Sequence, residues 1–146
     1  MKVQIFLGIQ MDKLTEQFRG THFNLPVNIK YAENCLEIEG ATDIGPFTSI
    51  SASNKIKIGY GTIIAPCVCI TDTDHNIGKD IDRINDAGIS KPITIGKYCW
   101  IGANSVILKG VTLGDGCIVG AGAIVTKSFP ARSIIVGNPA RLLRTR

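Results

Sequence analysis

Residues 95–125 read IGKYCWIGANSVILKGVTLGDGCIVGAGAIV, and an aliphatic residue recurs at every sixth position of this stretch. The same period occurs earlier in the chain, in two other phases. The aliphatic positions are Ile38, Ile44, Ile50, Ile58, Ile64, Ile70, Ile95, Ile101, Ile107, Leu113, Val119 and Val125. A period of six fits neither a helix nor one flat strand, so the repeat predicts short strands separated by corners.

A second set of positions lies four residues after the aliphatic ones and carries mostly small side chains. Its members are Thr42, Thr48, Thr62, Val68, Cys99, Ser105, Val111, Cys117 and Ala123. Each six-residue unit therefore supplies two inward side chains and a corner, and three units close a triangular coil. Glycine follows the aliphatic residue at six corners, as expected where a chain turns sharply: Gly45, Gly59, Gly96, Gly102, Gly114 and Gly120. The pattern predicts an all-β fold, a parallel β-helix of about five coils.

The repeat is interrupted twice, and the interruptions divide a single domain of residues 1–146. Residues 76–92 carry no sixfold pattern and are expected to form a protruding loop, a kind of segment that is often functional. Residues 1–25 also lack the repeat and are expected to cap the first coil, with a short helix over Met11–Phe18. The β-helix is expected over 26–130 and a closing segment over 131–146.

The closing segment holds the excess positive charge of the chain. Residues 1–126 contain 11 basic and 12 acidic side chains, whereas residues 127–146 contain five basic and no acidic ones. Phe129 is the single aromatic residue among these basic residues. One short basic segment without alternating aromatic residues argues against nucleic-acid binding. No apolar run reaches the roughly 18 residues of a membrane helix, so membrane insertion is not expected.

The five cysteines are interpreted as free thiols. Five is an odd number, and Cys67-Val68-Cys69 lacks the two-residue gap of a zinc knuckle or a redox dithiol. Cys99 and Cys117 share one phase of the repeat and should stack about 4.8 Å apart. A disulfide between them is conceivable, but two reduced core side chains are favoured. The short apolar patch Ile5–Ile9 is followed by polar and charged residues, so a secretory signal is not expected and a cytoplasmic protein is predicted. Free thiols fit such a reducing compartment.

The pattern resembles the hexapeptide-repeat acyltransferases over Ile38–Arg144. The stretches that carry the resemblance are Lys91–Gly96, Trp100–Gly102 and Gly120–Gly122. Within that family the sequence is most similar to galactoside, maltose and surface-polysaccharide O-acetyltransferases. The resemblance implies a left-handed β-helix, an exception to the usual right-handed crossover. It also implies a homotrimer that uses acetyl-CoA as co-substrate.

His75 is the candidate catalytic residue. It lies in Thr71-Asp72-Thr73-Asp74-His75, where the loop leaves the repeat, and a rigid corner beside a shielding loop suits a general base. The resembled enzymes carry one catalytic histidine at this point. Asp72 or Asp74 either orients the imidazole or is only solvated; both readings stay open.

A metal site is not expected. The β-helical carbonic anhydrases, a rival use of the fold, bind zinc through three histidines, and this chain has only two. The second, His22, is interpreted as a surface residue.

The resemblance also implies the residues that contact acetyl-CoA. They are Trp100, Ala103, Ala121, Thr126, Lys127, Arg141 and Arg144. The backbone amide of Ala103 would stabilise the tetrahedral oxyanion. Arg141 and Arg144 match phosphate-binding basic residues, since arginine can grip a phosphate with two hydrogen bonds. Trp100 precedes an inward isoleucine and should face outward, where it would either wall the cofactor groove or pack in a subunit interface.

The predicted function is acetyl-CoA-dependent transfer of an acetyl group to a sugar hydroxyl in polysaccharide or lipopolysaccharide biosynthesis. Two alternatives remain: an N-acetyltransferase acting on an amino-sugar nucleotide or another small acceptor, and a non-catalytic scaffold. The acceptor is open, because the sugar-binding asparagine of the resembled enzymes has no counterpart near Gly45–Phe47. The loop residues Arg83, Asn85 and Asp86 would contact a saccharide or merely be solvated.

Overall fold

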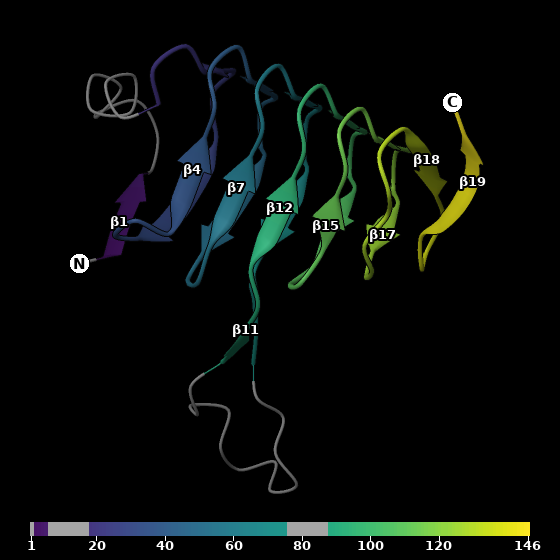
Figure 1. Ribbon diagram of the computed structural model, residues 1–146. Helices are drawn as coiled ribbons and strands as arrows, with labels where there is room; N and C mark the ends of the chain where they lie inside the picture. Colours follow the sequence, from purple (N-terminus) through teal and green to yellow (C-terminus); the bar gives the residue numbers. More distant parts are fainter. Residues whose placement is uncertain (1, 6–17, 76–87) are drawn as a thin grey trace, which may run out of the picture.

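Three sheets wrap around one apolar column and form a stack of triangular coils (Figure 1). The computed structural model describes residues 2–5, 18–75 and 88–146. Each complete coil gives one strand to each sheet, and strands of successive coils pair in parallel. The predicted parallel β-helix of about five coils is confirmed.

The sheets are called A, B and C below. Sheet A contains β1 (Lys2–Ile5), β3 (Asn28–Ala32), β6 (Ser49–Ala52), β9 (Cys69–Thr71), β14 (Val106–Ile107) and β17 (Ile124–Val125). Sheet B contains β2 (His22–Phe23), β5 (Asp43–Ile44), β8 (Ile63–Ile64), β13 (Trp100–Ile101), β16 (Ile118–Val119), β18 (Ser133–Val136) and β19 (Arg141–Thr145). Sheet C contains β4 (Leu36–Ile38), β7 (Ile56–Ile58), β12 (Ile93–Ile95) and β15 (Thr112–Leu113).

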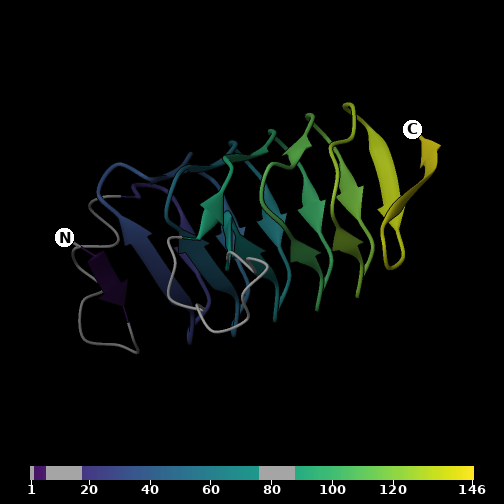
Figure 2. The ribbon, with the colours of Figure 1, turned by 90° about the horizontal axis from the view of Figure 1, so that it is seen from below.

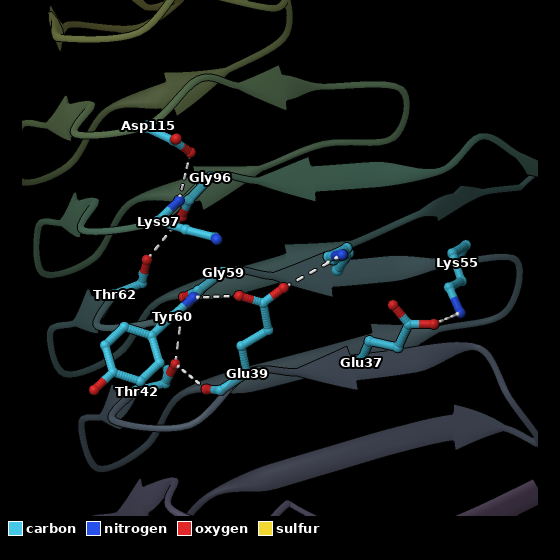
Figure 3. Close-up of polar contacts among 11 residues, drawn as sticks. Glu37, Glu39, Thr42, Lys55, Gly59, Tyr60, Thr62, Gly96, Lys97 and Asp115 are labelled. Carbon is cyan, nitrogen blue, oxygen red and sulfur yellow. Dashed lines mark hydrogen bonds and ion pairs between the residues drawn. The ribbon is translucent and has the colours of Figure 1, made fainter.

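The core contains the two predicted sets of inward side chains, together with further buried residues such as Ile29, Ile56 and Ile93. All twelve aliphatic positions and all nine small positions are buried. Several of the small positions are polar, and their hydroxyls donate to backbone carbonyl oxygens at the corners. Thr62 Oγ1, for example, donates to the Gly96 carbonyl at 2.9 Å (Figure 3), and Ser105 Oγ donates to the Gly102 carbonyl at 2.7 Å. Small polar side chains therefore fit inside the coil without losing hydrogen bonds.

The glycines after the aliphatic positions are not required by the predicted sharp turn. None of the six has a positive φ; that conformation falls two residues further on, as at Asn104 (φ 58°). A Cβ on Gly59 would lie 2.7 Å from the Gly96 carbonyl carbon, and one on Gly102 would lie 2.6 Å from the Ala121 nitrogen. The glycines are therefore required because the next coil's backbone approaches closely.

The N-terminal part of the chain extends the stack. β2 pairs in parallel with β5, so the first coil already includes His22, which is exposed and whose Nδ1 lies 3.4 Å from Asp43 Oδ1. β1 pairs antiparallel with β3 at the end of sheet A. The helix expected over Met11–Phe18 lies outside the described residues apart from Phe18, and none of the described residues is helical.

The predicted loop leaves the stack between sheets A and C. Its base is an antiparallel pair, β10 (Thr73–Asp74) with β11 (Ile89–Ser90), which projects away from the coils (Figure 1). Figure 2 shows the stack of coils from the side on which this pair projects. Residues 76–87 lie outside the described residues, and with them Arg83, Asn85 and Asp86.

All five cysteines are free thiols, as predicted. Cys99 Sγ donates to the Gly114 carbonyl oxygen at 3.3 Å, and Cys117 Sγ donates to the Pro130 carbonyl oxygen at 3.1 Å. A hydrogen bond with Cys117, together with burial, raises the pKa of the Cys99 thiol. This residue is therefore held as a protonated core side chain.

Candidate active site

The coil corners form three edges along the stack, named after the sheets that they join. The B–A edge contains residues 45–47, 65–67, 102–104 and 120–122. The A–C edge contains residues 53–55, the root of the loop, 108–110 and 126–128. The C–B edge contains residues 39–41, 59–61, 96–98, 114–116 and 130–132. Corner residues of one edge lie about 4.8 Å apart from coil to coil, the spacing of paired strands.

Two backbone donors on the B–A edge have no partner within the described part of the chain. They are the amide N–H groups of Ala103 and Ala121, whose neighbours Gly102 and Gly122 do donate to carbonyl oxygens of adjacent coils. Ala121 is exposed and Ala103 is half-buried. The corners thus present two donors to whatever occupies this edge.

The same corner position in the two preceding coils is occupied by Pro46 and Pro66. No group of the coil accepts a hydrogen bond from the backbone at this position, so proline, which has no N–H group, fits there. On this edge, therefore, the coils of Ala103 and Ala121 have a free N–H group at the corner, and the two preceding coils have none. Consecutive donors of this kind suit an anionic or carbonyl oxygen.

Two corner donors on the C–B edge are bound by carboxylates (Figure 3). The amide of Tyr60 donates to Glu39 Oε2 at 3.0 Å, and the amide of Lys97 donates to Asp115 Oδ1 at 2.8 Å. The hydrogen bond from Tyr60, with one from Lys57, lowers the pKa of the exposed Glu39 carboxyl. The corner amides of Asp115 and Ala131, however, also have no partner within the described residues, so open donors occur on more than one edge of the coil.

Arg141 lies at the last coil of the B–A edge. The turn at 137–140 continues this edge, because Ile124 donates to the Gly137 carbonyl and Ala140 donates to the Ile124 carbonyl. Arg141 follows as the first residue of β19, opposite Val136, and Arg144 lies further along β19, opposite Ile134. Both arginines are exposed. Ala103, Ala121 and Arg141 thus occur in that order along one edge.

Trp100 lies on the outer face of sheet B, as predicted, and its side chain is 53% exposed. It is paired with Ile63 on one side and Ile118 on the other. In the chain it lies three residues before Ala103.

The remaining predicted residues lie on another edge. His75 is exposed just beyond β10 at the A–C edge. Thr126 and Lys127 are exposed two coils further along that edge, and the Lys127 ammonium lies 5.6 Å from the centre of the Phe129 ring. Strand register places Ala103 beside Pro66, so the six-residue width of sheet A, about 20 Å, separates it from the loop root. Within one chain His75 and Ala103 do not meet.

Neither aspartate holds the His75 ring. Asp72 is fully buried and accepts from backbone amides of residues 53–55, and Asp74 forms an ion pair with Lys109. Residues 53–55 and Lys109 escaped the sequence analysis, because the hexapeptide pattern does not show which corner a carboxylate faces. The contrast between proline at Pro46 and Pro66 and alanine at the equivalent Ala103 is visible in the sequence, but its meaning depends on the corner register.

Two observations bound the chemistry of the described residues. They include no group of three or more His, Cys, Asp or Glu side chains arranged to hold a metal ion. They also include no helix that is long and apolar enough to cross a membrane.

The fold and this edge define a β-helix built from six-residue repeats that presents backbone donors and arginine along one corner. A family model described as the hexapeptide repeat of succinyl-transferase matches residues 92–127. A solved galactoside acetyltransferase in complex with coenzyme A is 31% identical, with a TM-score of 0.68 over 92% of this chain and 68% of that one. The chain belongs to the hexapeptide-repeat acyltransferase family.

Two further proteins show the same likeness. An acetyltransferase of Vibrio cholerae O1 biovar eltor, solved with acetyl-CoA, is 28% identical with a TM-score of 0.77, covering 90% of this chain and 73% of that one. The galactoside O-acetyltransferase of Escherichia coli (strain K12) is 43% identical over 89 residues, 61% of this chain and 43% of that protein. The chain spans about half the length of the curated relatives it matches.

Proposed function

We propose that the protein transfers the acetyl group of acetyl-CoA to a sugar hydroxyl, in polysaccharide or lipopolysaccharide biosynthesis. The observation that carries this proposal is the B–A edge, where the amides of Ala103 and Ala121 are open and Arg141 follows one coil later. An extended molecule with a carbonyl at one end and phosphates at the other fits this order. The similar galactoside O-acetyltransferase supports a sugar hydroxyl as acceptor.

In the proposed reaction His75 removes the proton of the acceptor hydroxyl. The oxygen of this hydroxyl attacks the thioester carbonyl carbon at the same time. The amide of Ala103 donates to the carbonyl oxygen, which becomes negatively charged. When the carbon–sulfur bond breaks, the imidazolium returns its proton to the departing thiolate. The products are the O-acetyl sugar and free coenzyme A.

A second copy of the chain completes the proposed site, because His75 of one chain does not reach Ala103 of the same chain. The outer face of sheet B supports an assembly, since it carries Ile63, Trp100, Ile118 and Ile134 in register on four neighbouring strands. Ile63 and Trp100 are each about half exposed, and apolar patches of this kind mark interfaces. We propose a homotrimer, with the neighbour's His75 facing the B–A edge.

We propose a cytoplasmic location, which the free thiols and the acetyl-CoA requirement support. The test is release of free coenzyme A from acetyl-CoA, measured with a panel of hydroxyl and amino sugars. We expect turnover with hydroxyl acceptors, with the acetyl group recovered as an ester. Turnover confined to amino acceptors would contradict the proposed acceptor class, and absence of acetyl-CoA binding at near-millimolar concentration would favour a scaffold.

The two arginines of β19 should bind the phosphates of acetyl-CoA. Replacing Arg141 and Arg144 together by Ala is expected to raise the KM for acetyl-CoA about tenfold or more, because each charge-assisted hydrogen bond is worth about 1.5–3 kcal/mol. The value of kcat should change much less, since these contacts are equal in the ground and transition states. Steady-state kinetics with acetyl-CoA varied would measure both constants.

Arg146 is the control for this experiment. It belongs to the same basic segment, but its guanidinium lies over Gly116 on the C–B edge, away from Ala103. Arg146→Ala should leave the KM unchanged. An equal rise in KM for both variants would mean that the segment acts only through its overall charge.

A further inference from the structure

The root of the loop is fastened to the preceding coil by a buried carboxylate. Asp72 is fully buried, and its oxygens accept hydrogen bonds from the amides of Ser53 (2.8 and 3.1 Å), Asn54 (2.7 Å) and Lys55 (2.9 Å). The Thr73 hydroxyl donates to the same carboxylate at 2.9 Å. Three successive amides and a hydroxyl fix the position and rotation of this side chain, since charge-assisted hydrogen bonds are strong and directional.

The same root is fastened to the returning strand and to the following coil. The Lys91 amide donates to the Asp72 carbonyl oxygen at 2.9 Å, which joins the two legs of the loop. Asp74, one residue before His75, forms an ion pair with Lys109 of the next coil. The root is therefore held from both sides, with Asp72 and Asp74 as the two anchor points.

This anchoring is specific to the place where the loop leaves. Strand register puts Ala52 and Lys109 beside Asp72 in the neighbouring coils, and Lys127 one coil further, so none of these equivalent residues is acidic. The carboxylates Glu39 and Asp115 on the C–B edge each hold a single corner amide. These other coil corners therefore form without a buried carboxylate, whereas the coil that carries His75 contains one.

We infer that Asp72 is a positioning residue for His75, acting with the Asp74–Lys109 ion pair. This rests on the proposed function, in which His75 is the general base. The carboxylate fixes the backbone three residues before the imidazole, and the ion pair fixes the backbone one residue before it. No hydrogen bond joins either aspartate to the His75 ring, so both act through the backbone. Their role is to place the base, because small misplacements of a reacting group cost large factors in rate.

The test is Asp72→Asn, which keeps the side-chain volume but replaces one acceptor oxygen by an amide donor. We expect kcat to fall about tenfold or more, because His75 is displaced, while the KM for acetyl-CoA stays within about twofold. The matched control is Asp115→Asn, the same change at a carboxylate that holds the Lys97 amide on another edge. Its kcat should stay within about twofold of the wild type. A wild-type kcat in a folded Asp72→Asn protein would overturn the inference.

A double-mutant cycle separates positioning from general damage to the coil. In a His75→Ala background, Asp72→Asn should lower the residual activity by no more than about twofold, because the group that it positions is absent. The same loss in both backgrounds would mean a structural role and would overturn the inference alone. A wild-type protein that transfers no acetyl group would overturn the proposed function, and this inference with it.

Lys109→Met is the second variant and is used if Asp72→Asn does not fold. It removes the ion pair with Asp74 and leaves the hydrogen bonds from the amides of residues 53–55 to Asp72 in place. We expect kcat to fall severalfold with the same dependence on His75. A kcat equal to that of the wild type, or a loss that persists in the His75→Ala background, would contradict the inference.

Discussion

His75→Ala is expected to lower kcat for acetyl transfer by at least about a hundredfold, the usual contribution of a positioned general base. The acceptor hydroxyl would then attack while still protonated, and the departing thiolate would lose its proton donor. The exposed imidazole makes no hydrogen bond with the rest of the described chain, so its removal should leave the coil intact. Release of free coenzyme A in the presence of a sugar acceptor measures the change.

The other histidine of the chain provides the control. His22 on β2 is also exposed and interacts with Asp43 on β5, near the opposite end of the stack from Arg141. His22→Ala should retain the wild-type kcat. If His75→Ala retained it as well, His75 would not be the base and the proton would have another acceptor.

The coil architecture was predictable because its cause is local. A buried residue at every sixth position and a small one four residues later leave only a triangular coil that can bury both, and Ile101 and Ser105 illustrate the pair. The first coil was less visible, since β2 and β3 carry a looser spacing of apolar residues. The glycine after the aliphatic position was noticed, but its reason, the approach of the next backbone at Gly59 and Gly102, needed the stacked coils.

The sequence names candidate site residues one by one, but it does not contain their arrangement. His75 and Ala103 are named by their motifs, yet nothing in the repeat shows that the width of sheet A separates them. Asp72 shows the same limit: its sequence position beside His75 suggested contact with the ring, whereas its carboxylate faces the corner of the preceding coil. Contacts between coils depend on register, and the loop changes that register by an amount that the sequence pattern does not contain.

Ala103→Pro is expected to lower kcat about a hundredfold to a thousandfold, the loss typical of an oxyanion donor. The substitution removes the backbone N–H group and little else. Proline already occupies the equivalent corner position at Pro46 and Pro66, and Ala103 has no positive φ, so the coil accommodates the ring. The KM for acetyl-CoA should change less than kcat, because the oxyanion forms only in the transition state.

Ala103→Gly is the matched control, since it changes the side chain but keeps the N–H group. Its kcat should remain close to that of the wild type. Circular dichroism and a denaturant titration would show whether the proline variant keeps the fold. Equal losses in the glycine and proline variants would assign the effect to the side chain or to backbone rigidity and would remove the Ala103 amide from the mechanism.

The proline variant also decides whether two copies build the site. If His75 of one copy faces Ala103 of its neighbour, then mixing His75→Ala subunits with Ala103→Pro subunits restores sites in which both groups are wild type. In a cyclic trimer with equal, random mixing, about a quarter of the interfaces combine an intact histidine with an intact amide. Activity should therefore recover to about a quarter of the wild-type value, far above either variant alone. No recovery after verified subunit exchange would place both groups in one chain, in conflict with the width of sheet A that separates them.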